Sequence, residues 1–158
     1  MIARTKEEIQ ILREGGKRLA RHVRILSEMV RPGVSGEELE KKAREMVEKD
    51  GDRMAFHGYG KEPFPSGLCV SVNDVIVHSP AGQNGSIFEE GDIVCLDFGI
   101  VHKGLYTDHA VTVIVGKPNS NDDERLARGV FEALRLGIAQ ARVGNTTGDI
   151  GHAVERFA

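Results

Sequence analysis

The sequence predicts an α+β protein, because segments with helical periodicity surround a stretch of strand-like alternation. Residues 5–50 and 121–144 carry apolar side chains at steps of three and four, which is the period of a helix that packs on one face. Residues 64–115 alternate apolar and polar side chains between turn residues, as in a small antiparallel sheet. The 40% hydrophobic and 28% charged residues agree with a globular protein.

Two helices are predicted before the sheet. The first runs from a capping box at residues 5–8 to the Pro-Gly pair at residues 32–33. The second runs from another capping box, at residues 35–38, to Gly51. Their apolar stripes are Ile9, Leu12, Leu19, Val23, Leu26 and Val30 in the first helix and Leu39, Ala43, Met46 and Val47 in the second.

Three strands and a further helix are predicted next. The strands cover residues 68–78, 93–100 and 105–115, and the helix runs from residue 121 to Gly144. The apolar face of this helix consists of Leu126, Val130, Leu134 and Ile138.

An internal repeat is suggested by residues 142–150, which echo residues 31–39 at an offset of 111. In both places a helix ends at glycine, a hydroxyl residue caps the next helix, and an acid follows three residues later. The alternative is that any two capped helices look alike. We expect one domain over residues 1–158, with a first repeat at about 5–115 and a second beginning at about 119–158.

Charge and composition exclude several function classes. Twenty-one basic and 24 acidic residues give a net charge of -3, which favours neither nucleic acid nor a membrane as partner. Residues 1–7 contain no apolar leader segment, so a cytoplasmic location is expected. Cys69 and Cys95 form no C-x-x-C pair, which predicts two buried thiols, with neither a disulfide framework nor a zinc knuckle.

The residues that carry chemistry are predicted to include Asp97 and Asp108. Asp97 lies in an apolar strand, where a carboxylate is costly unless it is paired or bound to a cation. A hairpin centred between residues 102 and 103 would place Asp108 directly opposite Asp97. Opposed like charges leave three options, which are a shared proton, a neighbouring cationic side chain or a metal ion. Two solvated edge residues remain the alternative.

His78 is the third candidate. It is predicted at the end of the strand over residues 71–78, before Ser79 and Pro80, where functional side chains are often presented. An imidazole beside a carboxylate pair could be a metal ligand, a hydrogen-bond donor to a substrate or a proton carrier. A surface histidine at a strand end is the competing interpretation.

Taken together, these motifs resemble those of the methionine aminopeptidases, which are dinuclear-metal hydrolases with the pita-bread fold. The resemblance runs the whole length, and its most specific part combines four segments. These segments are Cys69-Val-Ser-Val-Asn-Asp-Val-Ile-Val-His78, Glu90-Gly-Asp-Ile-Val-Cys-Leu-Asp97-Phe-Gly99, Gly104-Leu-Tyr-Thr-Asp108 and Asp149-Ile-Gly-His-Ala-Val154. The chain departs from the family at residues 61–63, which look like a small insertion, and at residues 78–81, where the family reads His-Gly-Ile-Pro.

The resemblance implies the roles of the candidate residues. Asp97 as a bidentate ligand and Asp108 as a bridging ligand would hold two divalent metal ions (Co, Mn, Fe or Zn), and His78 would contact the scissile amide. Three further residues, Tyr59, Phe64 and Cys69, would lie near the pocket for the methionine side chain. The implied function is removal of the N-terminal methionine from peptides and nascent chains, with ribosome association as a further option.

The family's other metal ligands, a His and two Glu, belong to a second half that this sequence does not contain. We therefore expect either a fragment or a chain that cannot complete the family site alone, unless a second copy replaces the missing half. An Xaa-Pro peptidase of the same fold is the alternative enzyme. A non-catalytic binding module that retains half of the site is the alternative from another class.

Overall fold

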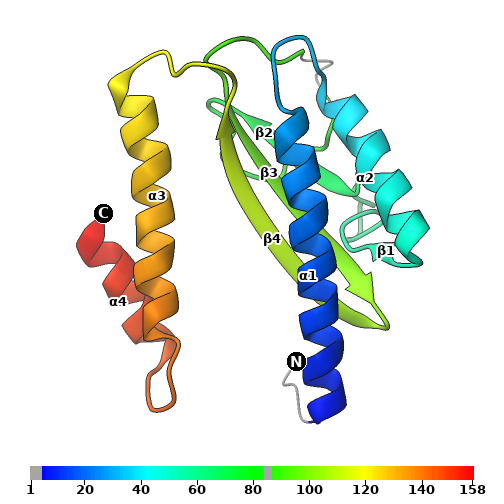
Figure 1. Cartoon of the computed structure of the whole chain (residues 1–158), viewed down its shortest axis with the longest axis vertical. Coiled ribbons are helices and arrows are strands. Elements are labelled where there is room, and N and C mark those ends of the chain that lie inside the picture. The colour runs from blue at the N-terminus through cyan, green and yellow to red at the C-terminus, as the bar shows by residue number, and fades with distance from the viewer. Residues whose placement is uncertain (1–4, 84–86) are drawn as a thin grey trace. The chain divides into compact units, whose positions relative to one another are not determined.

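The computed structural model describes residues 5–83 and 87–158 and divides the chain into two compact units, Met1–Lys117 and Pro118–Ala158. The α+β class is confirmed (Figure 1). The boundary between the units falls between the two predicted repeats. In chain order the elements are α1 (Lys6–Met29), α2 (Gly36–Asp50), β1 (Arg53–Met54), β2 (Leu68–Val72), β3 (Ile93–His102), β4 (Leu105–Ile114), α3 (Asn121–Gln140) and α4 (Thr147–Phe157).

The predicted starts of the first two helices are confirmed, and both capping boxes form. The hydroxyl of Thr5 accepts a hydrogen bond from the backbone N–H of Glu8 at 3.0 Å, and the Glu8 carboxylate accepts one from the Thr5 N–H at 3.0 Å. A similar pair at residues 35–38 opens α2, and Gly51 ends α2 in the left-handed region with φ 71°. The predicted third helix is too long, since α3 ends at Gln140.

The first unit is built around β3. One edge of β3 pairs with β1 and β2 and the other edge pairs with β4, and every pairing is antiparallel. The β3–β4 hairpin is the longest part of the sheet, and α1 lies along it (Figure 1). The two-residue strand β1 was not predicted, because it is too short to show alternation.

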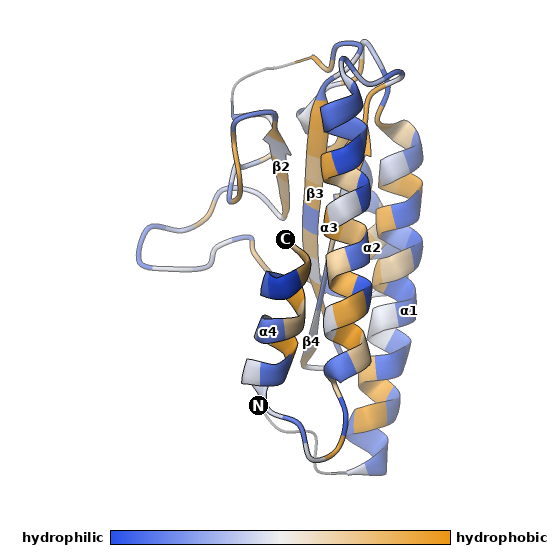
Figure 2. Cartoon of the chain, turned by 90° about the vertical axis from the view of Figure 1, so that its left-hand side faces the viewer, coloured by the Kyte–Doolittle hydropathy of each residue, from blue (hydrophilic) through white to orange (hydrophobic). Residues whose placement is uncertain are grey.

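The two faces of the sheet differ. Figure 2 shows the sheet from its side, with α1 and α2 against one face. Even-numbered residues of β3 point to this face and are fully buried, and they pack against the apolar stripes of the two helices. The buried members of this core include Leu19, Val23, Leu26, Leu39, Val47, Val94, Leu96, Phe98 and Ile100. Odd-numbered residues of β3, including Asp97, point to the opposite face.

The predicted register of the β3–β4 hairpin is wrong by two residues. Asp97 pairs with Ala110, and Asp108 pairs with Gly99, so the two aspartates are not directly opposite. The reason is the turn, because Lys103 at φ 48° and Gly104 at φ 84° form a two-residue loop with two left-handed residues. Such a loop is centred between residues 103 and 104. The shift by an even number of residues keeps both aspartates on one face.

The predicted strand over residues 68–78 is also too long, since β2 ends at Val72. Asn73 follows in the left-handed region with φ 53°, and its side-chain oxygen accepts a hydrogen bond from the N–H of Ile93 at 3.0 Å. Its amide nitrogen donates to Asp92 at 2.9 Å. These bonds turn the chain out of the sheet, so His78 lies in a loop rather than at the end of a strand.

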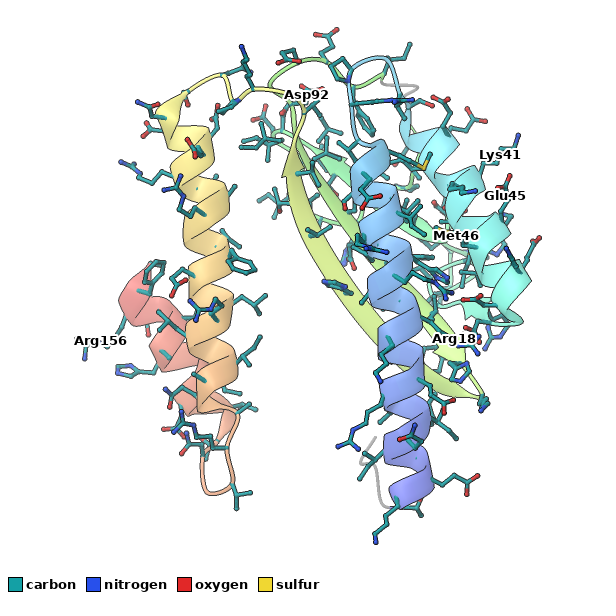
Figure 3. All side chains as sticks on the ribbon, viewed as in Figure 1. Arg18, Lys41, Glu45, Met46, Asp92 and Arg156 are labelled. Carbon is teal, nitrogen blue, oxygen red and sulfur yellow. The ribbon has the colours of Figure 1, made fainter. Side chains whose placement is uncertain are left out.

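A charged cluster joins the tip of the hairpin to α1 and to the end of α2. His102 is buried, and its ring nitrogens lie 2.7 Å from Asp52 and 3.3 Å from Glu14. Arg18 extends from α1 to Asp52 at 3.3 Å (Figure 3). The pKa of Glu14 is lowered to about 2, mainly because its carboxylate accepts a hydrogen bond from the Lys103 ammonium. The cluster holds the C-terminal end of β3 in place and accounts for the burial of His102, which was not predicted as a site residue.

The second unit is the helical pair α3–α4. Gly137 is buried between the helices, where a side-chain Cβ would lie 3.1 Å from Val154. The predicted apolar face of α3 is exposed, including Leu126 at 61% and Ile138 at 63%, and Figure 2 shows apolar bands along both helices. Among the described residues, no helix is long and apolar enough to cross a membrane. The N-terminal residues 1–4, on which part of the location prediction rests, lie outside the described residues.

Candidate functional site

A hollow of about 390 Å³ lies on the face of the sheet opposite the helices. It brings together all six residues that the sequence predicts for the site, and it adds two that were not predicted. The predicted residues are Tyr59, Phe64, Cys69, His78, Asp97 and Asp108, and the additional ones are Phe56 and Glu62.

Three strands place the polar centre of the hollow. Cys69 of β2 pairs directly with Asp97 of β3, so both side chains point to the same face. Asp108 of β4 is the diagonal neighbour of Asp97, because its direct partner is Gly99. Diagonal neighbours on one face are within reach of each other's side chains.

The ionised form of Asp97 is disfavoured in the hollow. Burial is the main cause that raises the pKa of Asp97 from its usual 3.8 to about 6, and the charge of Asp108 adds to it. The nearby His78 acts in the opposite direction and lowers the pKa of Asp97. Among the described residues, no lysine or arginine forms an ion pair with either aspartate. Among these residues, His78 is therefore the side chain that offsets part of the negative charge beside Asp97.

The two cysteines are free thiols, as predicted, although only Cys69 is buried and Cys95 is half-buried. Burial is the main cause that raises the pKa of Cys69 to about 12, and the charges of Asp97 and Asp108 raise it further. A thiol with this pKa stays protonated at neutral pH and is a poor nucleophile. Cys69 therefore contributes a small, apolar wall to the hollow.

His78 reaches the hollow through a loop that returns along β2. The backbone N–H of Val70 donates to the carbonyl of Ser79 at 2.9 Å, and the N–H of Ala81 donates to the carbonyl of Leu68 at 3.2 Å. His78 itself has φ 61°, a conformation that costs energy in most residues other than glycine. The loop therefore holds the imidazole at the rim by backbone contacts with β2.

Glu40 of α2 fixes the start of β2. Its carboxylate accepts hydrogen bonds from the backbone N–H groups of Gly67 at 3.0 Å and Leu68 at 2.9 Å, and from the hydroxyl of Ser66 at 3.0 Å. Arg44 pairs with the same carboxylate at 2.8 Å. Since Cys69 follows directly, Glu40 determines where β2 presents its side chain to the hollow.

Phe56 forms a wall that sequence analysis missed. It lies just after β1, and the N–H of Ala55 donates to the carbonyl of Gly99 at 2.9 Å, which lays this segment over β3. A Cβ at Gly99 would lie 2.8 Å from the Phe56 ring and 2.9 Å from the Ala55 side chain. A glycine inside a strand indicates a close approach of this kind, so Gly99 was the available signal.

Replacing Gly99 by alanine should therefore displace Phe56 from the wall of the hollow. We expect the free energy of unfolding to fall by about 1–3 kcal/mol, the usual cost of overpacking. Urea unfolding of both proteins measures this loss. Gly16, where an added Cβ meets nothing within 4 Å, provides the matched alanine substitution. Equal stability of the Gly99 and Gly16 variants would contradict the assignment.

The two aspartates fit part of a metal site. Carboxylate oxygens are hard donors that suit divalent cations, and their mutual repulsion would be relieved by a bound cation. Within residues 5–83 and 87–158, no group of three or more His, Cys, Asp or Glu side chains is arranged to hold a metal ion. The described residues thus offer two candidate carboxylates and form no metal-binding group by themselves.

The sequence profile of metallopeptidase family M24 matches residues 10–158. The chain belongs to metallopeptidase family M24. The pita-bread fold that the sequence predicts is thereby confirmed for the part of the fold that this chain spans. Among M24 relatives, a methionine aminopeptidase from Aquifex aeolicus is 38% identical over 98% of this chain. Another from Clostridium perfringens is 35% identical over 99% of this chain.

Solved structures of the M24 family agree. A methionine aminopeptidase from Thermotoga maritima superposes with a TM-score of 0.91 and 34% identity over 99% of this chain. An Xaa-Pro dipeptidase from Bacillus anthracis gives a TM-score of 0.80 at 24% identity, which shows the shared fold alone. The chain spans about 60% of the length of the curated relatives, with 60% of the Aquifex protein and 61% of the Clostridium protein covered.

Proposed function

We propose that this chain contributes the hollow around Asp97, Asp108 and His78 to a methionine aminopeptidase that uses two divalent metal ions. The observation that carries the proposal is the hollow itself, because one cavity contains the carboxylate pair, the imidazole and an apolar wall. The identity of 38% and 35% to two methionine aminopeptidases supports this substrate over proline-containing ones.

The apolar wall is suited to a methionine side chain. Phe56, Tyr59, Phe64 and the protonated Cys69 surround one part of the hollow. A flexible thioether makes favourable contacts with aromatic rings, so methionine gains more from such a wall than a small polar residue does. We infer that the N-terminal side chain of the peptide lies against these residues, and that nascent chains and peptides are the substrates.

In this proposal the carboxylates of Asp97 and Asp108 would hold the divalent metal ions. The bound metals would supply a water whose pKa is lowered toward roughly 7, and hence a hydroxide at neutral pH. His78, held at the rim by its loop, would donate a hydrogen bond to the scissile amide as negative charge develops on its oxygen. The resemblance implies that the general base of the family is a glutamate of the second half. No residue of this chain is therefore assigned as the general base.

Release of methionine from Met-Ala peptides with added Mn²⁺ or Co²⁺, measured on the whole enzyme to which this chain contributes the hollow, tests the proposal. Changing Asp97 or Asp108 to alanine should lower the rate by at least about 100-fold, since loss of a ligand costs more than loss of a residue that supports one. Asp74→Ala, an exposed carboxylate that does not line the hollow, should keep the wild-type rate. Activity that is indifferent to Asp97 and Asp108 would reject the site, and faster release from Ala-Pro peptides would favour the Xaa-Pro alternative.

A further inference from the structure

We propose that Glu62 is a specificity-determining residue that favours peptides with a basic side chain at their second or third position. The inference rests on the proposed peptidase site, because it assumes that a peptide N-terminus occupies the hollow. It goes further by assigning a role to one of the two lining residues that the sequence did not predict.

The loop that carries Glu62 is braced at both ends. The N–H of Gly58 donates to the carbonyl of Phe64 at 2.9 Å, and the N–H of Phe64 donates to the carbonyl of Tyr59 at 2.9 Å. Gly60 adopts φ 94°, which glycine tolerates without strain, and Pro63 restricts the backbone directly after Glu62. The loop therefore presents Glu62 in a defined position beside the apolar wall.

The Glu62 carboxylate is available to a ligand. It is exposed, it lines the hollow, and within the described residues it makes no hydrogen bond or ion pair. Its neighbour Lys61 does not line the hollow. Of these two charged neighbours, only the acidic Glu62 lines the hollow.

Metal binding would not neutralise the charge of Glu62. Asp97 and Asp108 would be neutralised by the proposed ions, whereas Glu62 forms no metal-binding group with them among the residues described. Glu62 therefore remains a net negative charge beside a bound peptide. Opposite charges within a few ångströms attract even in water, and like charges repel by the same amount.

The part of the peptide that Glu62 meets follows from the order of residues along the loop. Tyr59 and Phe64, which flank the tip, form the wall assigned to the methionine side chain, while His78 and the aspartates lie at the reacting bond. Glu62 stands on the exposed tip between the two aromatic residues. The proposal assigns Glu62 to the part of the peptide that extends out of the hollow, and therefore to the side chains that follow the methionine.

The test measures affinities of metal-loaded protein for fluorescent peptides whose first amide is a non-hydrolysable ketomethylene group. Lysine, glutamine or glutamate is placed at the second position of one series and at the third position of another. The wild-type protein should bind one series with a preference for lysine over glutamate of roughly fivefold or more. This preference should shrink from about 0.01 M to about 1 M salt, because salt screens exposed charges.

Two substitutions at Glu62 and one beside it decide the assignment. Glu62→Gln should abolish the preference, and Glu62→Lys should reverse it, while Lys61→Gln should leave lysine favoured over glutamate. A wild-type protein without charge preference, or a Glu62→Gln protein that keeps it, would overturn the proposal. So would failure of every peptide to bind.

Peptides that begin with alanine instead of methionine separate this proposal from the proposed function. Equal binding of both kinds of peptide would reject methionine recognition, although the Glu62 effect could still be present. A strong requirement for methionine without any effect of Glu62 would reject the charge selection alone.

Discussion

Replacing Glu40 by alanine should lower the free energy of unfolding by about 3 kcal/mol, because the buried N–H of Gly67 would lose its acceptor and Leu68 and Ser66 would lose a charged one. The backbone N–H groups of Gly67 and Leu68 and the hydroxyl of Ser66 all point to this carboxylate, and these three residues are buried. The structure offers no other side-chain acceptor to Gly67 among the described residues. Urea unfolding followed by circular dichroism measures the loss.

Glu37→Ala is the matched control for this prediction. Glu37 lies in the same helix, is exposed, and forms no hydrogen bond or ion pair with the residues of β2, so its removal should change stability by no more than about 0.5 kcal/mol. Glu40→Gln should fall between the two, since an amide oxygen still accepts a hydrogen bond. If Glu40→Ala unfolds at the same urea concentration as Glu37→Ala, the carboxylate does not hold the start of β2.

Changing Asp97 to asparagine should stabilise the metal-free protein at neutral pH and abolish its stabilisation by divalent metal. The folded-state pKa of about 6 lies above the usual 3.8, so ionisation of Asp97 opposes folding. This group destabilises little below pH 4, its cost grows between about pH 4 and pH 6, and the full cost is present above pH 6. Because the side chain is half-buried and solvent screens it, we expect on the order of 1 kcal/mol, or roughly 2–4 °C in Tm, at pH 7.5.

The pH dependence provides the internal control. The Tm difference between Asp97→Asn and wild type, both freed of metal by chelator, should be present at pH 7.5 and nearly absent at pH 4. Added Mn²⁺ should raise the Tm of the wild type but not of the variant, because a ligand that binds only the folded state stabilises it. Asp74→Asn should behave as wild type in both respects. A variant that is less stable than wild type at pH 7.5 would show that the Asp97 charge is compensated.

Much of the fold could be predicted because local patterns decide it. The capping boxes at residues 5–8 and 35–38 define the starts of α1 and α2 regardless of the rest of the molecule. The register of the hairpin could not be predicted in the same way, because it depends on whether Lys103 adopts a left-handed conformation that lysine rarely takes. The end of β2 depends likewise on hydrogen bonds from Asn73 to residues about 20 positions away.

The candidate site was partly predictable for a related reason. Asp97 stands out because a carboxylate in an apolar strand requires an explanation. Asp108 stands out because the hairpin brings it near Asp97, His78 because it was expected at a strand end, and the resemblance to a family supplied their roles. Phe56 and Glu62 carry no such signal in the sequence. Phe56 reaches the hollow only because Gly99 lets a distant segment cross the sheet, and Glu62 only because two backbone bonds close its loop.

Because side chains alternate in direction along β3, its even-numbered and odd-numbered residues belong to two different surfaces. Residues 94, 96, 98 and 100 pack against the helices, whereas residues 95, 97 and 99 face the opposite side of the sheet, where Asp97 lines the hollow. A single-residue insertion or deletion inside β3 would exchange these two sets and place the carboxylate in the core. We therefore expect β3 and residues 61–63 to respond differently to a change in length. An insertion or deletion in β3 should damage stability and chemistry together. An added residue at 61–63 should alter only which peptides the hollow prefers.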